Sequence, residues 1–303
     1  MLTPQLVRRL TLGPGDHPEG RPHISAASGL VRVGGSLFMV ADDERHLVQL
    51  AAERIADAPL RLVRLAPGPL PAEPVARKKA KPDLEALVHL PGASSSPALL
   101  VALGSGSRPQ RDQAFVFQVD EAGALAGPAV AVAMGALCAA LRQRFPELNL
   151  EAAFVQHGHL HLVQRAHGGQ PLNGLVRLPI EAVRHWLEGT TPTAPAPASV
   201  DLLDLGQVDG VPLGITDAAA WPAGGWIFSA VAEDTSNAYD DGRCVASVIG
   251  RVDPHGRVAR CEPLHGAPKV EGIAVAGPGL LWMVTDADDP ARPSELLQLR
   301  WQA

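Results

Sequence analysis

One glutamate interrupts a stretch of small and apolar residues near the end of the chain. The stretch is KVEGIAVA, residues 269–276, in which Glu271 precedes residues with the composition of a buried strand. A charged carboxylate is costly to bury unless it is paired, hydrogen-bonded or bound to a metal. Glu271 therefore indicates either a strand end at a solvent-filled opening or part of a functional site.

A polar residue followed by a small one occurs in this setting five times along the 303 residues. The five polar residues are 57, 66, 66 and 54 positions apart, and 60 positions separate the last from the first through the chain ends. Such near-equal spacing is typical of a repeated structural unit. The motifs are AASGLVRV with Ser28, DLEALVHL with Glu85, NLEAAFVQ with Glu151, ITDAAAWP with Asp217 and VEGIAVAG with Glu271.

Each unit continues with a turn, an apolar strand, a polar loop, a third strand and usually a fourth. Four antiparallel strands per unit, repeated around an axis, predict an all-β fold that is a single β-propeller of residues 1–303. Five blades are expected, with six as the alternative if residues 51–80 hold another. The last unit ends after its third strand, and residues 5–12 supply a fourth that closes the ring without a free edge. The predicted blades span residues 24–70, 82–134, 148–206, 214–263, and 268–303 joined by 5–12.

Three segments between the predicted strands have other patterns. Apolar residues at helical spacing predict helices over residues 135–145 and 180–189. The proline-rich segment 190–199 indicates an extended surface loop. The basic cluster Arg77-Lys78-Lys79, with Lys81, is interpreted as a solvated loop beside prolines.

The first strand of a propeller blade lines the central channel, so the repeated acids should converge near one mouth of it. Several carboxylates in a poorly solvated pocket repel one another strongly. A bound cation, shared protons, or basic neighbours such as Lys81 and Lys269 would relieve that repulsion. Oxygen ligands without cysteine or histidine suit a hard cation, and calcium tolerates such a ring better than magnesium. The predicted metal ligands are Glu85, Glu151, Asp217 and Glu271, with Ser28 completing the circle.

The polar loops after the second strands form a second set of candidates. These loops should emerge on the same face as the acids and form the rim of a shallow pocket. A small-molecule ligand in the channel is the expected partner. The predicted substrate-binding residues are Ser28, Asp42, Asp43, Ser105, Arg165, Glu233 and Asp286.

Composition argues against several other classes of protein. The net charge is −6 and the pI about 6.0, which gives no reason to expect nucleic acid or an anionic membrane as partner. No apolar run is long enough to span a membrane, and the N-terminus lacks the apolar region of a signal peptide, so a cytoplasmic location is expected. Cys138, Cys244 and Cys261 lie far apart, which argues against a disulfide framework or a zinc knuckle.

The SGL opening, the VADD end of the second strand and the recurring E-[GA]-[AI] strand starts resemble a known group of proteins. The group comprises the esterase-like phytase propellers and the wider gluconolactonase and senescence-marker propellers. The resemblance implies a propeller with calcium in its channel that hydrolyses lactones or phosphoesters. By position, the metal ring of that group corresponds to Glu85, Glu151, Asp217 and Glu271.

The first functional hypothesis is a calcium-dependent hydrolase of a small phosphoester, lactone or ester. In it the ion polarises an oxygen of the substrate, and Glu151 and Asp217 are the catalytic residues that act as base or nucleophile. A non-catalytic ligand-binding or scaffold propeller is the alternative, because fold does not imply function. A glycosidase is a further alternative, since two carboxylates suffice for that chemistry.

Overall fold

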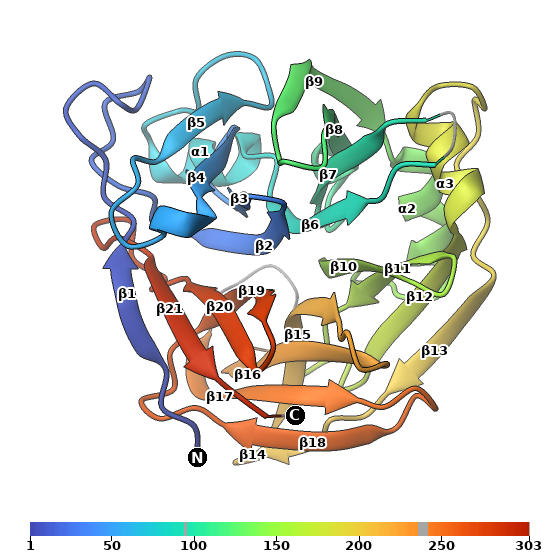
Figure 1. The fold of residues 1–303 in the computed structure, drawn as a ribbon. Helices are drawn as coiled ribbons and strands as arrows, with labels where there is room; N and C mark the ends of the chain where they lie inside the picture. The colour runs from blue at the N-terminus through green and yellow to red at the C-terminus, as the bar shows by residue number, and fades with distance from the viewer. Residues whose placement is uncertain (94–95, 236–241, 303) are drawn as a thin grey trace.

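The computed structural model describes residues 1–93, 96–235 and 242–302, which form five antiparallel sheets around one axis (Figure 1). Each sheet is one blade, so the predicted five-bladed propeller is confirmed. The five innermost strands neighbour one another around the axis. They are β2 (Ala27–Val33), β6 (Leu84–Leu90), β10 (Leu150–Gln156), β15 (Val211–Ala220) and β19 (Val270–Gly277).

The other strands of each blade follow outward in chain order. In the first two blades these are β3 (Ser36–Ala41), β4 (His46–Ala51) and β5 (Arg61–Arg64), then β7 (Ala98–Gly104), β8 (Gln113–Val119) and β9 (Leu125–Ala133). In the third and fourth they are β11 (His159–Gln164), β12 (Asn173–Pro179) and β13 (Ser199–Leu203), then β16 (Trp226–Asp234), β17 (Arg243–Val252) and β18 (Val258–Pro263). The short strand β14 (Gln207–Val208) pairs with the start of β15.

The hydrophobic core lies between the blades. Alternate residues of a strand point to opposite faces of its sheet. Leu37 and Met39 of β3 therefore pack with the last blade, whereas Phe38 and Val40 pack with the second. Five apolar clusters of this kind each join two neighbouring blades and hold the ring together.

The last blade contains both ends of the chain. Its strands are β19, β20 (Leu280–Thr285), β21 (Glu295–Arg300) and β1 (Gln5–Arg9), and β1 is antiparallel to β21. The predicted closure by the N-terminal strand is confirmed. This pairing covers the edge of β21, which would otherwise present unpaired backbone groups.

The structure contains both predicted helices and one that the sequence analysis missed. The predicted ones are α2 (Gly135–Arg142) and α3 (Ile180–Leu187). The missed helix is α1 (Pro74–Ala80), whose first turn is capped by Glu73 through the N–H groups of Val75 and Ala76. Arg77, Lys78 and Lys79 thus belong to a helix and not to a solvated loop, and Arg77 and Lys78 line the central cavity.

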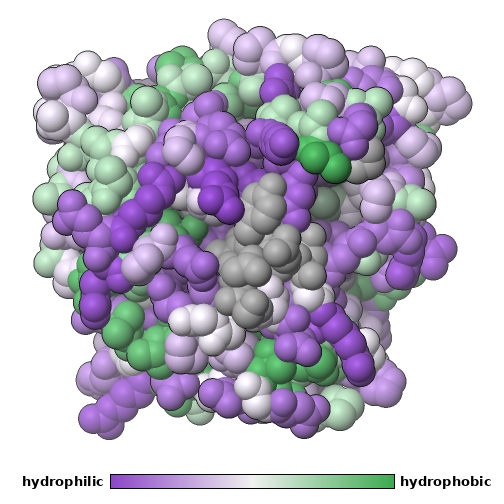
Figure 2. Space-filling model, turned by 180° about the vertical axis from the view of Figure 1, so that it is seen from behind, coloured by the Kyte–Doolittle hydropathy of each residue, from purple (hydrophilic) through white to green (hydrophobic). Residues whose placement is uncertain are grey.

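The described part of residues 51–80 contains η1 (Ala52–Arg54), β5 and α1 but no further blade, which rules out the six-bladed alternative. None of the helices in the described ranges combines the length and apolar character that crossing a membrane requires. Hydrophilic residues gather around the middle of the face seen in Figure 2.

Removal of β1 tests how far ring closure stabilises the propeller. Deleting residues 1–9 should lower the free energy of unfolding by roughly 2–4 kcal/mol, because the backbone pairs along β21 are lost. Thermal unfolding and size-exclusion chromatography should show a lower Tm and self-association through the exposed edge. Arg9→Gln, which keeps the strand, is the control; equal Tm values for both variants would contradict the expectation.

Candidate functional site

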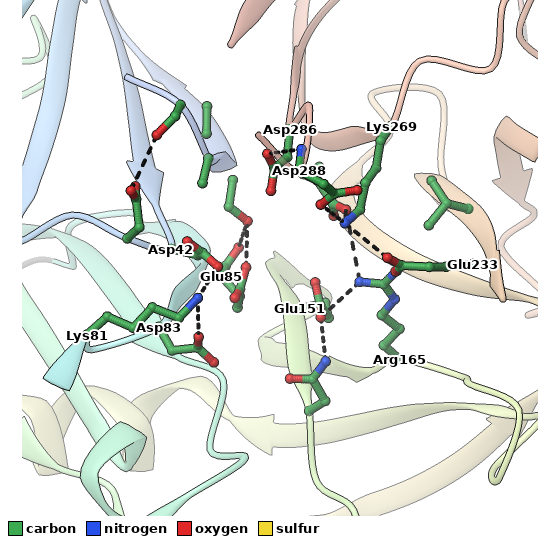
Figure 3. A pocket seen from close by; sticks show the side chains of 18 of the residues that line it. Asp42, Lys81, Asp83, Glu85, Glu151, Arg165, Glu233, Lys269, Asp286 and Asp288 are labelled. Atoms are coloured by element: carbon green, nitrogen blue, oxygen red, sulfur yellow. Dashed lines mark hydrogen bonds and ion pairs between the residues drawn. The ribbon is translucent and has the colours of Figure 1, made fainter. Parts of the chain in front are cut away.

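A cavity of about 320 Å³ lies on the axis, where the innermost strands meet the loops that follow the second strands (Figure 3). Its described lining is dominated by charged side chains. Ten carboxylates contribute to it: Asp42, Asp43, Asp83, Glu85, Glu151, Glu233, Glu271, Asp286, Asp288 and Asp289. Six cationic side chains accompany them: Arg77, Lys78, Lys81, Arg111, Arg165 and Lys269.

Every innermost strand has a β-bulge at the same place. The pairing with the second strand skips one residue there, and a bulge redirects the side chain of the extra residue. In three blades this residue is a glutamate that lines the cavity. The bulged residues are Gly29, Glu85, Glu151, Thr216 and Glu271.

This register differs by one position from the sequence alignment in two blades. The counterparts of the glutamates are Gly29 and Thr216, whereas the sequence pattern predicts Ser28 and Asp217. At Gly29, whose φ is +23°, an added Cβ would lie 2.8 Å from the backbone nitrogen of Leu87. The first blade therefore has no room for a carboxylate here. The hydroxyl of Ser28 instead lies 3.0 Å from both the carbonyl oxygen and Oε2 of Glu85.

Asp217 is not among the residues that line the cavity, which corrects the prediction that it belongs to a convergent ring. Its buried carboxylate accepts backbone N–H bonds from Ile273 at 2.7 Å, Ala218 at 2.8 Å and Leu30 at 3.3 Å. These donors belong to the innermost strands of three blades. Asp217 therefore joins the first, fourth and fifth blades, and its oxygens are already used.

One group of charges lies on the side of the first two blades. Lys81 Nζ contacts Asp42 and lies 3.0 Å from Asp83 Oδ1, while Arg111 Nη1 lies 2.6 Å from Asp83 Oδ2. Glu85 lies beside this group, but no Lys or Arg nitrogen of the described residues is within 4.0 Å of its carboxylate. Burial, followed by the nearby charge of Glu151, raises the pKa of Glu85 well above its usual range.

A second group faces it from the third, fourth and fifth blades (Figure 3). Arg165 contacts Glu233, and its Nη1 lies 3.3 Å from Glu151 and 4.0 Å from Glu271. Lys269 Nζ lies 3.2 Å from Glu233 and 3.6 Å from Glu271. Positive charge supplied by the chain itself therefore neutralises part of the acidic cavity.

The glutamates of this second group differ in how readily they ionise. Burial disfavours the charged form of Glu233, but Arg165 and Lys269 outweigh burial and lower its pKa. Burial raises the pKa of Glu271 well above its usual range despite Arg165 and Lys269. Burial also raises the pKa of Glu151, against Arg165 and a 2.5 Å hydrogen bond donated by Asn149.

The structure brings most of the predicted residues together. Those that line the cavity are Ser28, Asp42, Asp43, Glu85, Glu151, Arg165, Glu233, Glu271 and Asp286. Besides Asp217, the exception is Ser105, which is fully buried and donates to Asp83 Oδ2 at 2.5 Å. Ser105 thus positions a cavity carboxylate and does not line the cavity itself.

Several residues of the site were missed from the sequence: Asp83, Asn149 and Arg111. The first two precede a bulged glutamate by two positions, as Lys269 precedes Glu271. Residues two apart in an extended segment point to the same side, so this spacing was an available signal. Arg111 offers no such pattern, because the η2 turn (Pro109–Arg111) brings it to Asp83.

The residues do not fit the predicted calcium ring. Asp217 lies outside the cavity lining, and Glu151 is bonded by Asn149 and Arg165. Among the described residues of the cavity, the carboxylates compact enough for one ion are Asp42, Asp83 and Glu85, of which only Glu85 is predicted as a metal ligand. Lys81 already contacts two of these three, so an ammonium group provides the charge that calcium was expected to provide.

A second compact group of potential metal ligands, His17, Glu44 and His46, is buried outside the cavity. Nδ1 of His17 accepts the N–H of Glu19, so the neutral ring carries its proton on Nε2, 3.0 Å from Glu44 Oε1. A nitrogen that carries a proton is not a metal ligand. Burial disfavours ionised Glu44, but His46, Arg21 and His17 lower its pKa to about 2. This group is a hydrogen-bonded clamp around a carboxylate.

Residues 23–301 match the family described as a family of unknown function, DUF6929. The chain belongs to this family. None of the curated proteins compared with the DUF6929 chain matches it. The narrower likeness to the phytase and gluconolactonase propellers stays a prediction.

Three solved structures are similar to the DUF6929 chain in fold. The aldose sugar dehydrogenase of Streptomyces coelicolor is 14% identical, with 100% of this chain and 99% of that one covered and a TM-score of 0.51. The Myxococcus xanthus glutaminyl cyclase is 13% identical, with 100% and 98% covered and a TM-score of 0.50. The Podospora anserina α-L-arabinofuranosidase is 12% identical, with 100% and 97% covered and a TM-score of 0.51. At these identities the similarity shows the propeller fold alone.

Asp217→Asn tests whether this residue joins the blades. An amide keeps one acceptor and turns an N–H donor towards backbone N–H groups, so the free energy of unfolding should fall by about 2–3 kcal/mol. Glu151→Gln, which changes a carboxylate of the cavity lining, should alter it by less than about 1 kcal/mol. Denaturant unfolding of both variants measures the difference. Equal losses would show that Asp217 has no special structural role.

Asp286→Asn tests the acidity of the cavity. Burial and the charges of Asp42 and Asp288 raise the pKa of Asp286 to about 8, against Lys269. Between about pH 4 and pH 8 the folded protein therefore keeps a proton that the unfolded chain has lost. The free energy of unfolding of the wild type consequently falls as the pH rises through this range. Asp286→Asn should be more stable than wild type by on the order of 5 kcal/mol at pH 8 and equal to it near pH 4.

Unfolding curves recorded between pH 4 and 8 measure this effect. The exposed control Glu53→Gln should follow wild type at every pH. A stability difference between Asp286→Asn and wild type that does not change with pH would contradict the raised pKa.

Proposed function

We propose that the axial cavity hydrolyses the ester bond of a small polar molecule, with Glu85 as acid and Glu151 as base. One observation supports this assignment above the others: two cavity glutamates on the neighbouring strands β6 and β10 have different partners. Burial raises the pKa of both, but Arg165 and Asn149 contact Glu151 and favour its carboxylate. Glu85 has no Lys or Arg nitrogen of the described residues within 4.0 Å, and its pKa lies well above its usual range. Two carboxyl groups whose environments separate their pKa values are typical of an acid and base pair.

The proposed reaction uses Glu151 in its ionised form and Glu85 in its protonated form. Ionised Glu151 takes a proton from water, and the hydroxide that forms adds to the acyl carbon of the ester. The carbon–oxygen bond of the leaving group then breaks, and protonated Glu85 gives its proton to the departing alkoxide. Lys81 and Arg165, which flank the pair, stabilise negative charge on the former carbonyl oxygen.

A carboxylic ester or lactone suits the cavity better than a phosphoester. The described lining contains four more carboxylates than cationic side chains. A phosphate group would add negative charge to a cavity that already has an excess of it. The resemblance to gluconolactonase-like propellers favours the same class of substrate, although the proposed step depends on carboxyl groups and not on calcium.

The two alternatives receive less support from the geometry. A glycosidase would also find two carboxyl groups, but no Trp, Tyr or Phe is among the described lining residues, and aromatic platforms are usual for sugars. A non-catalytic binding propeller would use the same cavity without turnover. Kinetic measurements separate that possibility from an enzyme.

Glu85→Gln and Glu151→Gln provide the test. Hydrolysis of a panel of lactones and nitrophenyl esters by the wild type should fall by about 10²–10⁴-fold in kcat/KM for either variant. The wild-type rate should pass through a maximum with pH, because activity needs one protonated and one ionised carboxyl group. Circular dichroism and Tm establish that the variants are folded.

Glu53→Gln, which changes an exposed glutamate outside the cavity, is the matched control and should retain full activity. Ligand binding without turnover of any ester or lactone in the panel would favour the non-catalytic propeller. Turnover that survives both substitutions would overturn the assignment of Glu85 and Glu151.

A further inference from the structure

The excess of carboxylates in the cavity is not spread evenly over its walls. Lys81 and Arg111 contact Asp42 and Asp83, and Arg165 contacts Glu151 and Glu233. Lys269 Nζ lies within 4.0 Å of Glu233, Oε1 of Glu271 and Asp288. These carboxylates have partners within the chain. The negative charge that the chain leaves uncompensated therefore belongs to a few other residues.

Asp286 of the last blade is one of them. The N–H of Asp286 donates to the carbonyl of Lys269 at 3.0 Å, which places Asp286 across the strand pair from the start of β19 and thus near Glu271. No Lys or Arg nitrogen of the described ranges lies within 4.0 Å of the Asp286 carboxylate. Its Oδ1 accepts the N–H of Asp288 at 2.8 Å.

Glu271 is independent evidence that a carboxylate of the cavity lacks a hydrogen-bond partner. The residue is 5% exposed, and its Oε2 is buried without a hydrogen-bond partner among the described residues. An unsatisfied buried carboxylate oxygen costs several kcal/mol in general. Since Glu271 lines the cavity, a ligand there can reach this oxygen.

We infer that the substrate of the axial cavity carries a primary ammonium group, which Glu271 and Asp286 receive. The inference rests on the axial cavity being the substrate site proposed above. An ammonium group donates three hydrogen bonds and carries the positive charge that the lining lacks. A neutral hydroxyl would satisfy Oε2 of Glu271 but not the charge excess, and a carboxylate or phosphate would increase that excess.

The test compares ligands of similar size whose functional groups are cationic, neutral or anionic. Two matched sets serve: 1,5-diaminopentane, 1,5-pentanediol and glutarate, and glucosamine, glucose and glucuronate. Isothermal titration at low ionic strength and about pH 7, where both amines are cationic, should show an amine binding at least about 10-fold more tightly than its neutral counterpart in one or both sets. The acids should not bind. Equal or stronger binding of the neutral or anionic members would overturn the inference, as would binding of calcium chloride without binding of either amine.

Variants locate the ammonium group. Glu271→Gln and Asp286→Asn should each weaken binding of the amine about 10-fold and leave the neutral ligand within about 2-fold. Asp289→Asn removes the same charge from another part of the lining and should weaken the amine by no more than about 2-fold. Lys81→Met, which removes a positive charge on the opposite side, should strengthen it. Equal effects of Asp289→Asn and Glu271→Gln would contradict the assigned position.

The outcomes for binding and for hydrolysis are separable. Amine binding that depends on Glu271 without turnover of any ester supports the inference and contradicts the hydrolase. Turnover of neutral esters with no preference for amine-bearing ones supports the hydrolase and overturns the inference.

Discussion

The burial of carboxylates around a single axis is the constraint on which the rest of this propeller depends. Ten of them line one cavity, and such charges cannot share a poorly solvated space unless other groups compensate them. Arg165 and Lys269 compensate part of the charge on one side, and Lys81 and Arg111 do so on the other. Burial, together with the charge of Glu151, raises the pKa of Glu85 and Glu271 and makes the cavity suited to proton transfer and to cationic ligands.

The same residue type has two different tasks near the axis. At the bulge, Glu85, Glu151 and Glu271 point into the cavity and remain available for chemistry. One position after its own bulge, Asp217 turns to the backbone and connects three blades through N–H bonds. A shift of one residue along a strand turns a side chain to the other face of the sheet. One position in register therefore decides whether a carboxylate near the axis points into the cavity or binds the backbone.

Ring closure and site formation are linked through the last blade. Its outermost strand, β1, comes from the N-terminus, and its innermost strand, β19, supplies Glu271. The loop after β20 supplies Asp286 and Asp288 to the same cavity. Closure of the ring at this blade therefore fixes the positions of Glu271 and Asp286 in the cavity wall.

The sequence by itself determined the five-bladed propeller, its closure and three of the acids that line the cavity from the innermost strands, Glu85, Glu151 and Glu271. It did so because small and apolar residues recur at a nearly constant interval, and each interval has room for four strands. It did not determine the register of the bulges, since Gly29 and Thr216 are identified only by their pairing with β3 and β16. Nor did it determine what neutralises the acids. Arg111 and Arg165 reach Asp83 and Glu151 within their own blades, through loops that the strand pattern does not place. The contacts of Arg165 and Lys269 with Glu233 cross from one blade to another, so only the packing of the blades around one axis creates them.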